Sequence, residues 1–295
     1  MNASSLLLVA ALSAPQAEKL VSPDPPIECG MCEAWNRPHE PFQLFGNTYY
    51  VGTAGLSALL VTSDGGHVLL DGALSQSSAL IDANIRKLGF RTEDIEVIVN
   101  SHAHFDHAAG IAALQRASGA RVVTSPAGAS ALRDGMPAPD DPQASYGDGF
   151  PAVANVHAAG NGEAIRVGPL ALTIHFTPGH TPGGTSWTWR SCQGDRCLDM
   201  VYADSLTAVS APGYRFTDHP DVVEALRRSI GATAELSCDI MVSTHPEFSN
   251  VFEKLARRKA GEKDALIDPS ACRAYADGAA QTLDKRLEKE RAEAP

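Results

Sequence analysis

The sequence predicts an α/β fold, a four-layer sandwich in which two β-sheets form the centre and helices cover each of them. One observation is the alternation of strand-like and helix-like segments in the first half of the chain, which is typical of layered α/β proteins. A second is that the second half of the 295 residues brings another set of strands and helices in a similar order. No sequence repeat relates the halves.

An arm rich in proline and turn residues comes first, at 23–41, and is expected to be irregular. Three short strand-like runs separated by Gly-containing turns then predict an antiparallel meander, and a helical spacing of apolar residues ends at Gly89. The strands are expected at 48–51, 57–62 and 67–70, and the helix at 77–88.

The middle of the chain predicts a strand at 95–99, a helix at 108–117, a strand at 120–124 and a helix at 127–132. Residues 135–151 are then rich in Met, Pro, Asp, Gly and Ser. A loop of this length in a compact domain is usually functional or disordered, so it is a candidate rim or lid. Its Tyr146 and Phe150 fit the covering of local apolar surface equally well.

The second half predicts a second sheet with its own helices. Its strands are expected at 164–167, 171–176, 185–189, 198–203 and 240–243, and its helices at 222–236, 250–260 and 271–290.

Composition is that of an ordinary globular protein, with 44% hydrophobic and 20% charged residues. The net charge of -11 argues against nucleic acid and anionic membranes as partners, because there is no basic run to bind them. The apolar run Leu6–Leu12, followed by small residues, resembles a secretory signal and is too short to span a bilayer. We therefore expect a signal peptide at 1–17, a single domain at 18–295 and a periplasmic location.

The six cysteines are compatible with three disulfides in an oxidising compartment. Cys29 and Cys32 form a C-x-x-C motif, for which zinc binding is the rival interpretation. That interpretation is weakened because no second C-x-x-C stands at the spacing of a zinc ribbon or finger.

The segment S-H-A-H-F-D-H-A-A-G, at 101–110, directly follows a predicted strand. If the extended backbone continues, His102, His104 and Asp106 point to one side, and His107 turns away as a helix begins. Imidazoles with a carboxylate and no cysteine suit a zinc-like cation. Four such groups this close together are compatible with two metal ions.

Two more histidines stand where predicted strands end, a position at which α/β folds place chemistry. His180 lies in the turn T-P-G-H-T-P-G, and His245 follows the strand before S-T-H-P. With the 102–107 cluster they complete two sets of three ligands. The other histidines do not belong to such a ligand pattern and are expected to be structural or solvated: His39, His67, His157, His175 and His219.

In this order, the motifs H-x-H-x-D-H, T-P-G-H-T-P-G and S-T-H-P resemble the metallo-β-lactamase superfamily, whose fold is an αββα sandwich. The segment Y-A-D-S-L-T at 202–207, followed by A-P-G-Y, is similar to the third subclass of class B β-lactamases. In that subclass a serine replaces the cysteine ligand of the other subclasses. The run from Gly183 to Trp187 and the pair Cys238 and Cys272 also match in order.

The resemblance implies two zinc ions, one held by His102, His104 and His180 and the other by Asp106, His107 and His245. Three protein ligands per metal leave open positions, which is the mark of a catalytic zinc. A shared hydroxide is the expected nucleophile. The first zinc would polarise the lactam carbonyl and the second would stabilise the nitrogen released when the ring opens.

The same resemblance implies that Ser205 and Thr207 hold the carboxylate of a β-lactam, with threonine standing where the family has a second serine. Asp71 is expected to orient a ligand histidine, although Asp-Gly also marks turns. Asp204 leaves an alternative open, because related thiolesterases and homoserine lactonases use an aspartate in this region to bridge their metals. A non-catalytic zinc-storage module is disfavoured, since it has no need of open three-ligand sites.

We therefore expect an antibiotic-resistance enzyme that acts on small-molecule β-lactams as a monomer. Cys238 is expected to pair with Cys272, and Cys192 with Cys197. Cys29 and Cys32 either pair or remain thiols, because short C-x-x-C disulfides are often strained and reducible.

Overall fold

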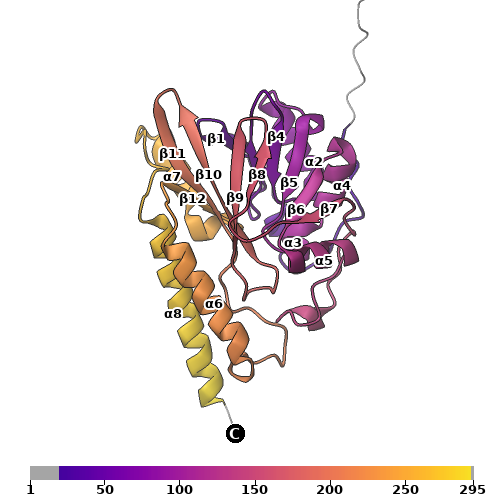
Figure 1. The fold of residues 1–295 in the computed structure, drawn as a ribbon, viewed down its shortest axis with the longest axis vertical. Helices are drawn as coiled ribbons and strands as arrows, with labels where there is room; N and C mark the ends of the chain where they lie inside the picture. Colours follow the sequence, from indigo (N-terminus) through magenta and orange to yellow (C-terminus); the bar gives the residue numbers. More distant parts are fainter. Residues whose placement is uncertain (1–19, 294–295) are drawn as a thin grey trace, which may run out of the picture.

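The computed structural model describes residues 20–293 and has two β-sheets at its centre, with helices on both outer sides (Figure 1). The first sheet has seven strands in the order β1-β2-β3-β4-β5-β6-β7, and the second has five in the order β12-β11-β10-β9-β8. This is the αββα sandwich that the sequence predicts. The signal peptide expected at 1–17 lies outside the described residues.

The strands of the first sheet are β1 (Phe42–Phe45), β2 (Thr48–Tyr50), β3 (Leu59–Val61), β4 (His67–Leu70), β5 (Ile95–Val99), β6 (Arg121–Thr124) and β7 (Val156–Ala158). Strands β1 to β4 form an antiparallel meander, and β4 to β7 pair in parallel. The second sheet contains β8 (Ala164–Val167), β9 (Leu170–Phe176), β10 (Thr185–Gln193), β11 (Arg196–Ala203) and β12 (Ile240–Ser243).

The helices are α1 (Cys32–Trp35), α2 (Ser77–Lys87), α3 (Phe105–Ala108), α4 (Ile111–Ser118), α5 (Pro126–Asp134), α6 (Pro220–Ala234), α7 (Val251–Lys259) and α8 (Ala271–Ala292). Short 3-10 turns lie at η1 (Thr92–Asp94), η2 (Ala144–Tyr146), η3 (Phe216–Asp218) and η4 (Pro246–Ser249). Within residues 20–293, none of the helices combines the length and the apolar character that crossing a membrane requires.

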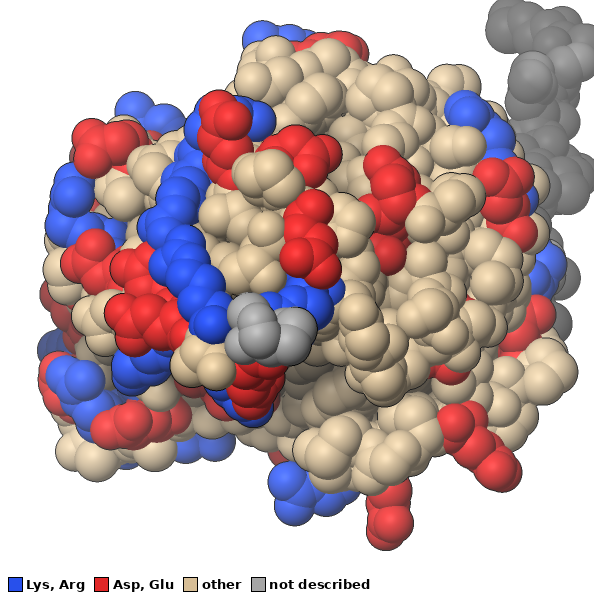
Figure 2. Space-filling model, turned by 90° about the horizontal axis from the view of Figure 1, so that it is seen from below, with Lys and Arg blue, Asp and Glu red and all other residues tan. Residues whose placement is uncertain are grey.

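Successive side chains of a strand point to opposite faces of its sheet, so one strand contributes to two different apolar layers. In β4, Leu69 packs with α2, α4 and α5, whereas Val68 and Leu70 pack between the two sheets against residues such as Trp187. A third cluster joins α6 and α8 beyond the second sheet. Figure 2 shows Lys and Arg intermixed with Asp and Glu on the side where α8 ends and α6 begins, while much of the neighbouring surface is uncharged.

Three expectations were incomplete. Two short strands at the edges of the first sheet, β1 and β7, were not predicted, and the arm at 23–41 contains the four-residue helix α1. The helix expected at 108–117 begins only at Ile111, as α4, and a separate short helix, α3, precedes it. A Cβ on Gly110, between these helices, would lie 2.1 Å from the carbonyl oxygen of Gly72, so close backbone contact governs this point of the chain.

The cysteines form three disulfides in the structure, Cys29–Cys32, Cys192–Cys197 and Cys238–Cys272. The last of these ties the segment before β12 to the first turn of α8, and Cys192–Cys197 closes the β10–β11 hairpin. Such cross-links restrict the unfolded chain and thereby favour the folded state.

Candidate metal centre

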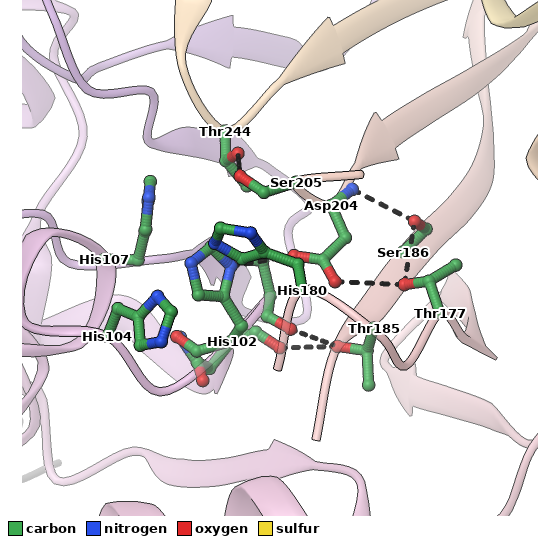
Figure 3. Close-up of polar contacts among 12 residues, drawn as sticks. His102, His104, His107, Thr177, His180, Thr185, Ser186, Asp204, Ser205 and Thr244 are labelled. Atoms are coloured by element: carbon green, nitrogen blue, oxygen red, sulfur yellow. Dashed lines mark hydrogen bonds and ion pairs between the residues drawn. The ribbon is translucent and has the colours of Figure 1, made fainter. Parts of the chain in front are cut away.

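The candidate site lies at one edge of the sandwich, in the segments that follow four of the strands. The cluster at 102–107 follows β5, His180 follows β9, the segment 204–207 follows β11, and His245 follows β12. The start of β10 ties the two sheets together there, because the backbone N–H of Thr185 donates to the carbonyl of Ser101 at 2.7 Å and its hydroxyl donates to the carbonyl of Asn100 at 2.7 Å (Figure 3).

The first ligand set consists of His102, His104 and His180, whose imidazoles face one another around a common centre (Figure 3). One ring nitrogen from each lies within 4.8 Å of the other two. All three side chains are buried. Burial lowers the pKa of His180 to about 3, and burial together with the neighbouring His107 holds the pKa of His102 well below its usual value. Neutral imidazoles are the form that binds a cation.

A hydrogen-bond partner on the far side of each imidazole decides which nitrogen faces the centre. His102 Nδ1 lies 2.8 Å from Asp204 Oδ1, and His180 Nδ1 lies 2.9 Å from the carbonyl oxygen of Thr207. In both rings Nε2 therefore faces the site, and the buried His102 Nε2 has no hydrogen-bond partner among the described residues. His104 is turned the other way, with Nε2 3.1 Å from both oxygens of Asp141, which leaves Nδ1 for the site. Each partner fixes a ring orientation and tautomer.

The second ligand set brings together Asp106, His107 and His245. Asp106 Oδ2 lies 3.3 Å from His107 Nε2 and 3.4 Å from His245 Nε2, and the two Nε2 atoms are 3.3 Å apart. His102 also falls within 4.8 Å of the atoms of Asp106 and His107, so the two sets are adjacent. Three electron-pair donors this close fit a divalent metal ion.

Asp106 is the anionic member of the six. Burial alone would raise the pKa of this carboxyl, but the His107 charge and hydrogen bonds from His107 and His245 hold it well below its usual range. The same carboxylate raises the pKa of His245 against the effect of burial. The carboxylate is therefore ionised, as a metal ligand must be.

Asp71 lies beneath this centre, wholly buried, in a left-handed backbone conformation with φ of 60° at the end of β4. Its carboxylate accepts hydrogen bonds from the Ser101 N–H at 2.7 Å and the Tyr202 hydroxyl at 2.8 Å. The nearest ligand nitrogen, His107 Nδ1, is 3.9 Å away. Asp71 thus supports the backbone before His102, and its role in orienting His107 stays a prediction. The carboxylates within hydrogen-bond distance of ligand imidazoles on their far side are Asp204 and Asp141, for which the sequence predicted no such role.

Ser205 and Thr207 both line the cavity above the metal site, which has a volume of about 300 Å³. Ser205 Oγ lies 2.9 Å from Thr244 Oγ1 (Figure 3), and Thr207 Oγ1 lies 3.1 Å from His180 Nδ1. Because His180 Nδ1 carries a hydrogen, Thr207 accepts there and keeps its own hydrogen free. Gln143 from the 135–151 loop also lines the cavity, 3.4 Å from His104 Nδ1.

The five histidines set aside in the sequence analysis lie outside both ligand sets. His39 stacks on Phe252 and His219 on Tyr214, and His67 meets the ring of Phe90 edge-on. His157 and His175 contact Asn155 and Thr188.

The fold and the paired donor sets define an αββα protein with a buried metal centre at one edge of its sheets. The family model described as the metallo-beta-lactamase superfamily matches residues 51–245, and the chain belongs to that superfamily.

Solved structures of β-lactamases are similar to the whole domain. The Rm3 metallo-beta-lactamase is 50% identical, with a TM-score of 0.87 over 90% of this chain and 100% of that one. MEM-A1, a subclass B3 metallo-beta-lactamase from a soil metagenome library, is 46% identical, with a TM-score of 0.85 over 88% of this chain and 100% of that one. The structural similarity therefore extends to the B3 subclass.

Curated relatives are more distant and carry another activity. A hydroxyacylglutathione hydrolase of Anaeromyxobacter dehalogenans is 36% identical over 100 residues, and the match covers 33% of this chain and 31% of that relative. The hydroxyacylglutathione hydrolase of Cereibacter sphaeroides is 28% identical over 210 residues, which cover 70% of this chain and 71% of that relative.

Proposed function

We propose that this protein is a zinc-dependent hydrolase that opens the β-lactam ring of antibiotics. Two zinc ions are proposed, one held by His102, His104 and His180 and the other by Asp106, His107 and His245. Two observations support this assignment: His102 Nε2 has no hydrogen-bond partner in the described part of the chain, and the donor atoms of Asp106, His107 and His245 approach one another closely. Bound zinc supplies Lewis acidity, which polarises a carbonyl and acidifies water.

The protein's own residues orient this chemistry. Asp204, Asp141 and the Thr207 carbonyl each hold the far nitrogen of an imidazole, so that the other nitrogen of each ring is directed into the site. Asp106 contributes a negative charge to the second set. A substrate would enter the 300 Å³ cavity, in which His104, Asp106, His180 and His245 form part of the lining.

The orientation of Asp204 is the observation that favours a lactamase over the alternative, a thiolesterase or acyl-homoserine lactonase of the same superfamily. In those relatives an aspartate of this region bridges the metals. Here Asp204 Oδ1 contacts His102 Nδ1, the nitrogen that faces away from the centre, and Oδ2 accepts from the Thr177 hydroxyl at 3.1 Å. Both oxygens are thus engaged by protein groups, and Oδ1 lies on the side of the imidazole that is turned away from the metal-facing Nε2. The alternative is retained because hydroxyacylglutathione hydrolases are among the relatives.

Turnover of three substrate classes tests this proposal. Zinc-loaded protein is expected to hydrolyse a chromogenic cephalosporin and to leave an acyl-glutathione thioester and an acyl-homoserine lactone largely intact. A chelator should abolish the cephalosporin reaction, and added zinc should restore it. Preference for the thioester or the lactone would establish the alternative, and full activity in metal-free protein would refute the metal dependence.

Ser205 and Thr207 are proposed to bind the carboxylate next to the lactam nitrogen. Among the described residues no Lys or Arg lines the cavity, so neutral donors such as these two hydroxyls must bind an anion there. Hydrogen bonds to a charged group contribute about 1.5 to 3 kcal/mol, so Ser205→Ala and Thr207→Val should each raise KM roughly tenfold or more with smaller changes in kcat. Parental KM values with intact zinc content would show instead that the hydroxyls only hold Thr244 and His180 in place.

The setting proposed for this enzyme is the periplasm, reached through a signal peptide at 1–17, where it would confer antibiotic resistance as a monomer. The three disulfides support an oxidising compartment.

A further inference from the structure

The mouth of the substrate cavity gathers exposed apolar side chains. Six large hydrophobic residues are exposed within the described part of the chain, and four of them line this one cavity: Met31, Tyr146, Val209 and Phe248. Each is about half exposed. Apolar groups concentrated on one rim mark a surface that meets an apolar part of a ligand.

These four side chains come from separate segments that the fold holds in place. Met31 belongs to the N-terminal arm, and Phe248 follows His245 in η4 with its ring 6.1 Å from that imidazole. Tyr146 lies in the 135–151 loop, and its hydroxyl donates to the carbonyl of Ser210 at 3.3 Å, next to Val209. A second bond, from the Ala211 N–H to the Pro142 carbonyl at 2.9 Å, anchors the same loop.

Two carboxylates stand on the same rim. Asp148 and Glu247 line the cavity, both are exposed, and neither forms an ion pair within residues 20–293. Within residues 20–293 no Lys or Arg lines the cavity to offset them. The metal centre is buried at the bottom, so the outer part of the cavity combines negative charge with aromatic and apolar surface.

We infer that the mouth of this cavity is a subsite for a positively charged aromatic substituent, such as a pyridinium group, carried by the β-lactam substrate. This inference rests on the proposed function. The carboxylates of Asp148 and Glu247 attract the charge, and the rings of Tyr146 and Phe248 offer faces to which an aromatic cation binds. An anionic substituent is repelled by the same carboxylates.

Two cephalosporins with the same 7-acyl group test the subsite, one with a 3-pyridiniomethyl group and the other with an uncharged 3-acetoxymethyl group. The quantity measured is the ratio of their kcat/KM values in the zinc-loaded enzyme. The two compounds differ in intrinsic reactivity, so the informative result is the change in this ratio between the parent and a variant, in which that difference cancels.

The double variant Asp148→Asn, Glu247→Gln should lower the ratio about threefold to tenfold at low salt, the range expected for one or two exposed charge pairs. The effect should shrink in about 1 M salt, where charges are screened within roughly 3 Å. The control is Asp277→Asn, Glu288→Gln, which removes the same charge from exposed positions on α8, outside the cavity lining. Its ratio should match that of the parent.

An unchanged ratio in the Asp148, Glu247 variant overturns the inference, and so does an equal change in the α8 control, which would report net charge alone. If the parent hydrolyses neither cephalosporin, the proposed function fails and the subsite fails with it. If both are hydrolysed and the Asp148, Glu247 variant leaves the ratio unchanged, the proposed function stands and only the subsite is refuted.

Discussion

Replacing Asp106 with alanine is expected to lower kcat/KM for a β-lactam by more than about a hundredfold, beyond the range typical of outer hydrogen-bond partners. The proposed second site would be left with two neutral imidazoles, His107 and His245, and no negative charge. Metal content measured on the purified variant should fall from two zinc ions per chain to one.

The fold should survive this change, because the side-chain contacts of Asp106 in the structure are with His107 and His245. Circular dichroism of the metal-free parent and variant is the control. Asp106→Asn keeps the shape of the side chain and removes its charge, so it should also lose the second zinc. Two bound zinc ions with parental turnover in either variant would contradict the assignment of Asp106 as a ligand.

Removing the Asp204 carboxylate is the second change with a large expected effect. Asp204→Ala removes the partner of His102 Nδ1 at 2.8 Å and leaves the more distant Ser101 hydroxyl at 3.3 Å, so the direction of Nε2 is held less firmly. Loss of such a partner typically costs 10- to 100-fold in metal affinity or activity. Competition with a chromophoric chelator measures the zinc affinity of the first site directly.

Asp204→Asn distinguishes the orienting role from a ligating one. Asparagine retains an oxygen that accepts from His102 Nδ1, so its zinc affinity should lie between those of the parent and the alanine variant. Loss of both metals in the asparagine variant would instead identify Asp204 as a bridging ligand. Gly184→Ala is an independent probe, since its Cβ would lie 2.3 Å from Asp204 Oδ2 and 2.6 Å from the Thr177 carbonyl oxygen, and would displace the carboxylate.

The six proposed ligands were predictable because each stands directly after a strand in a recognisable local pattern. The partners that hold them were not, because they are distant in the sequence. Asp204 is 102 residues from His102, and Asp141 is 37 residues from His104. No local spacing signals such contacts. The Asp204 carboxyl is wholly buried, and burial raises its pKa well above the usual value. The sequence Tyr-Ala-Asp-Ser does not indicate that this side chain is buried.

The helices and strands, too, were predictable where the signal is local and not where it depends on distant contacts. The pattern of apolar residues located α2 and β5, because these segments bury one face or both. It missed β7, whose three residues include the exposed His157 and Ala158 and which exists through its pairing with β6. The break between α3 and α4 depends on Gly110 meeting Gly72, which are 38 positions apart in the chain.

The N-terminal arm at 23–41 helps to form the substrate cavity but does not bind the metal. Met31 and Trp35 form part of the cavity wall, yet the arm lies outside both sheets and contributes none of the six proposed ligands. It is fastened by reciprocal hydrogen bonds between the Ile27 backbone and the Gln76 side chain, at 3.0 and 2.9 Å, and by the ring of Trp35, 5.4 Å from that of His245. A change at Met31 reshapes the wall without disturbing a ligand or a strand. Within the arm, Met31 is therefore a position at which the cavity wall can be altered, whereas Trp35 is not, because its ring packs against the proposed ligand His245.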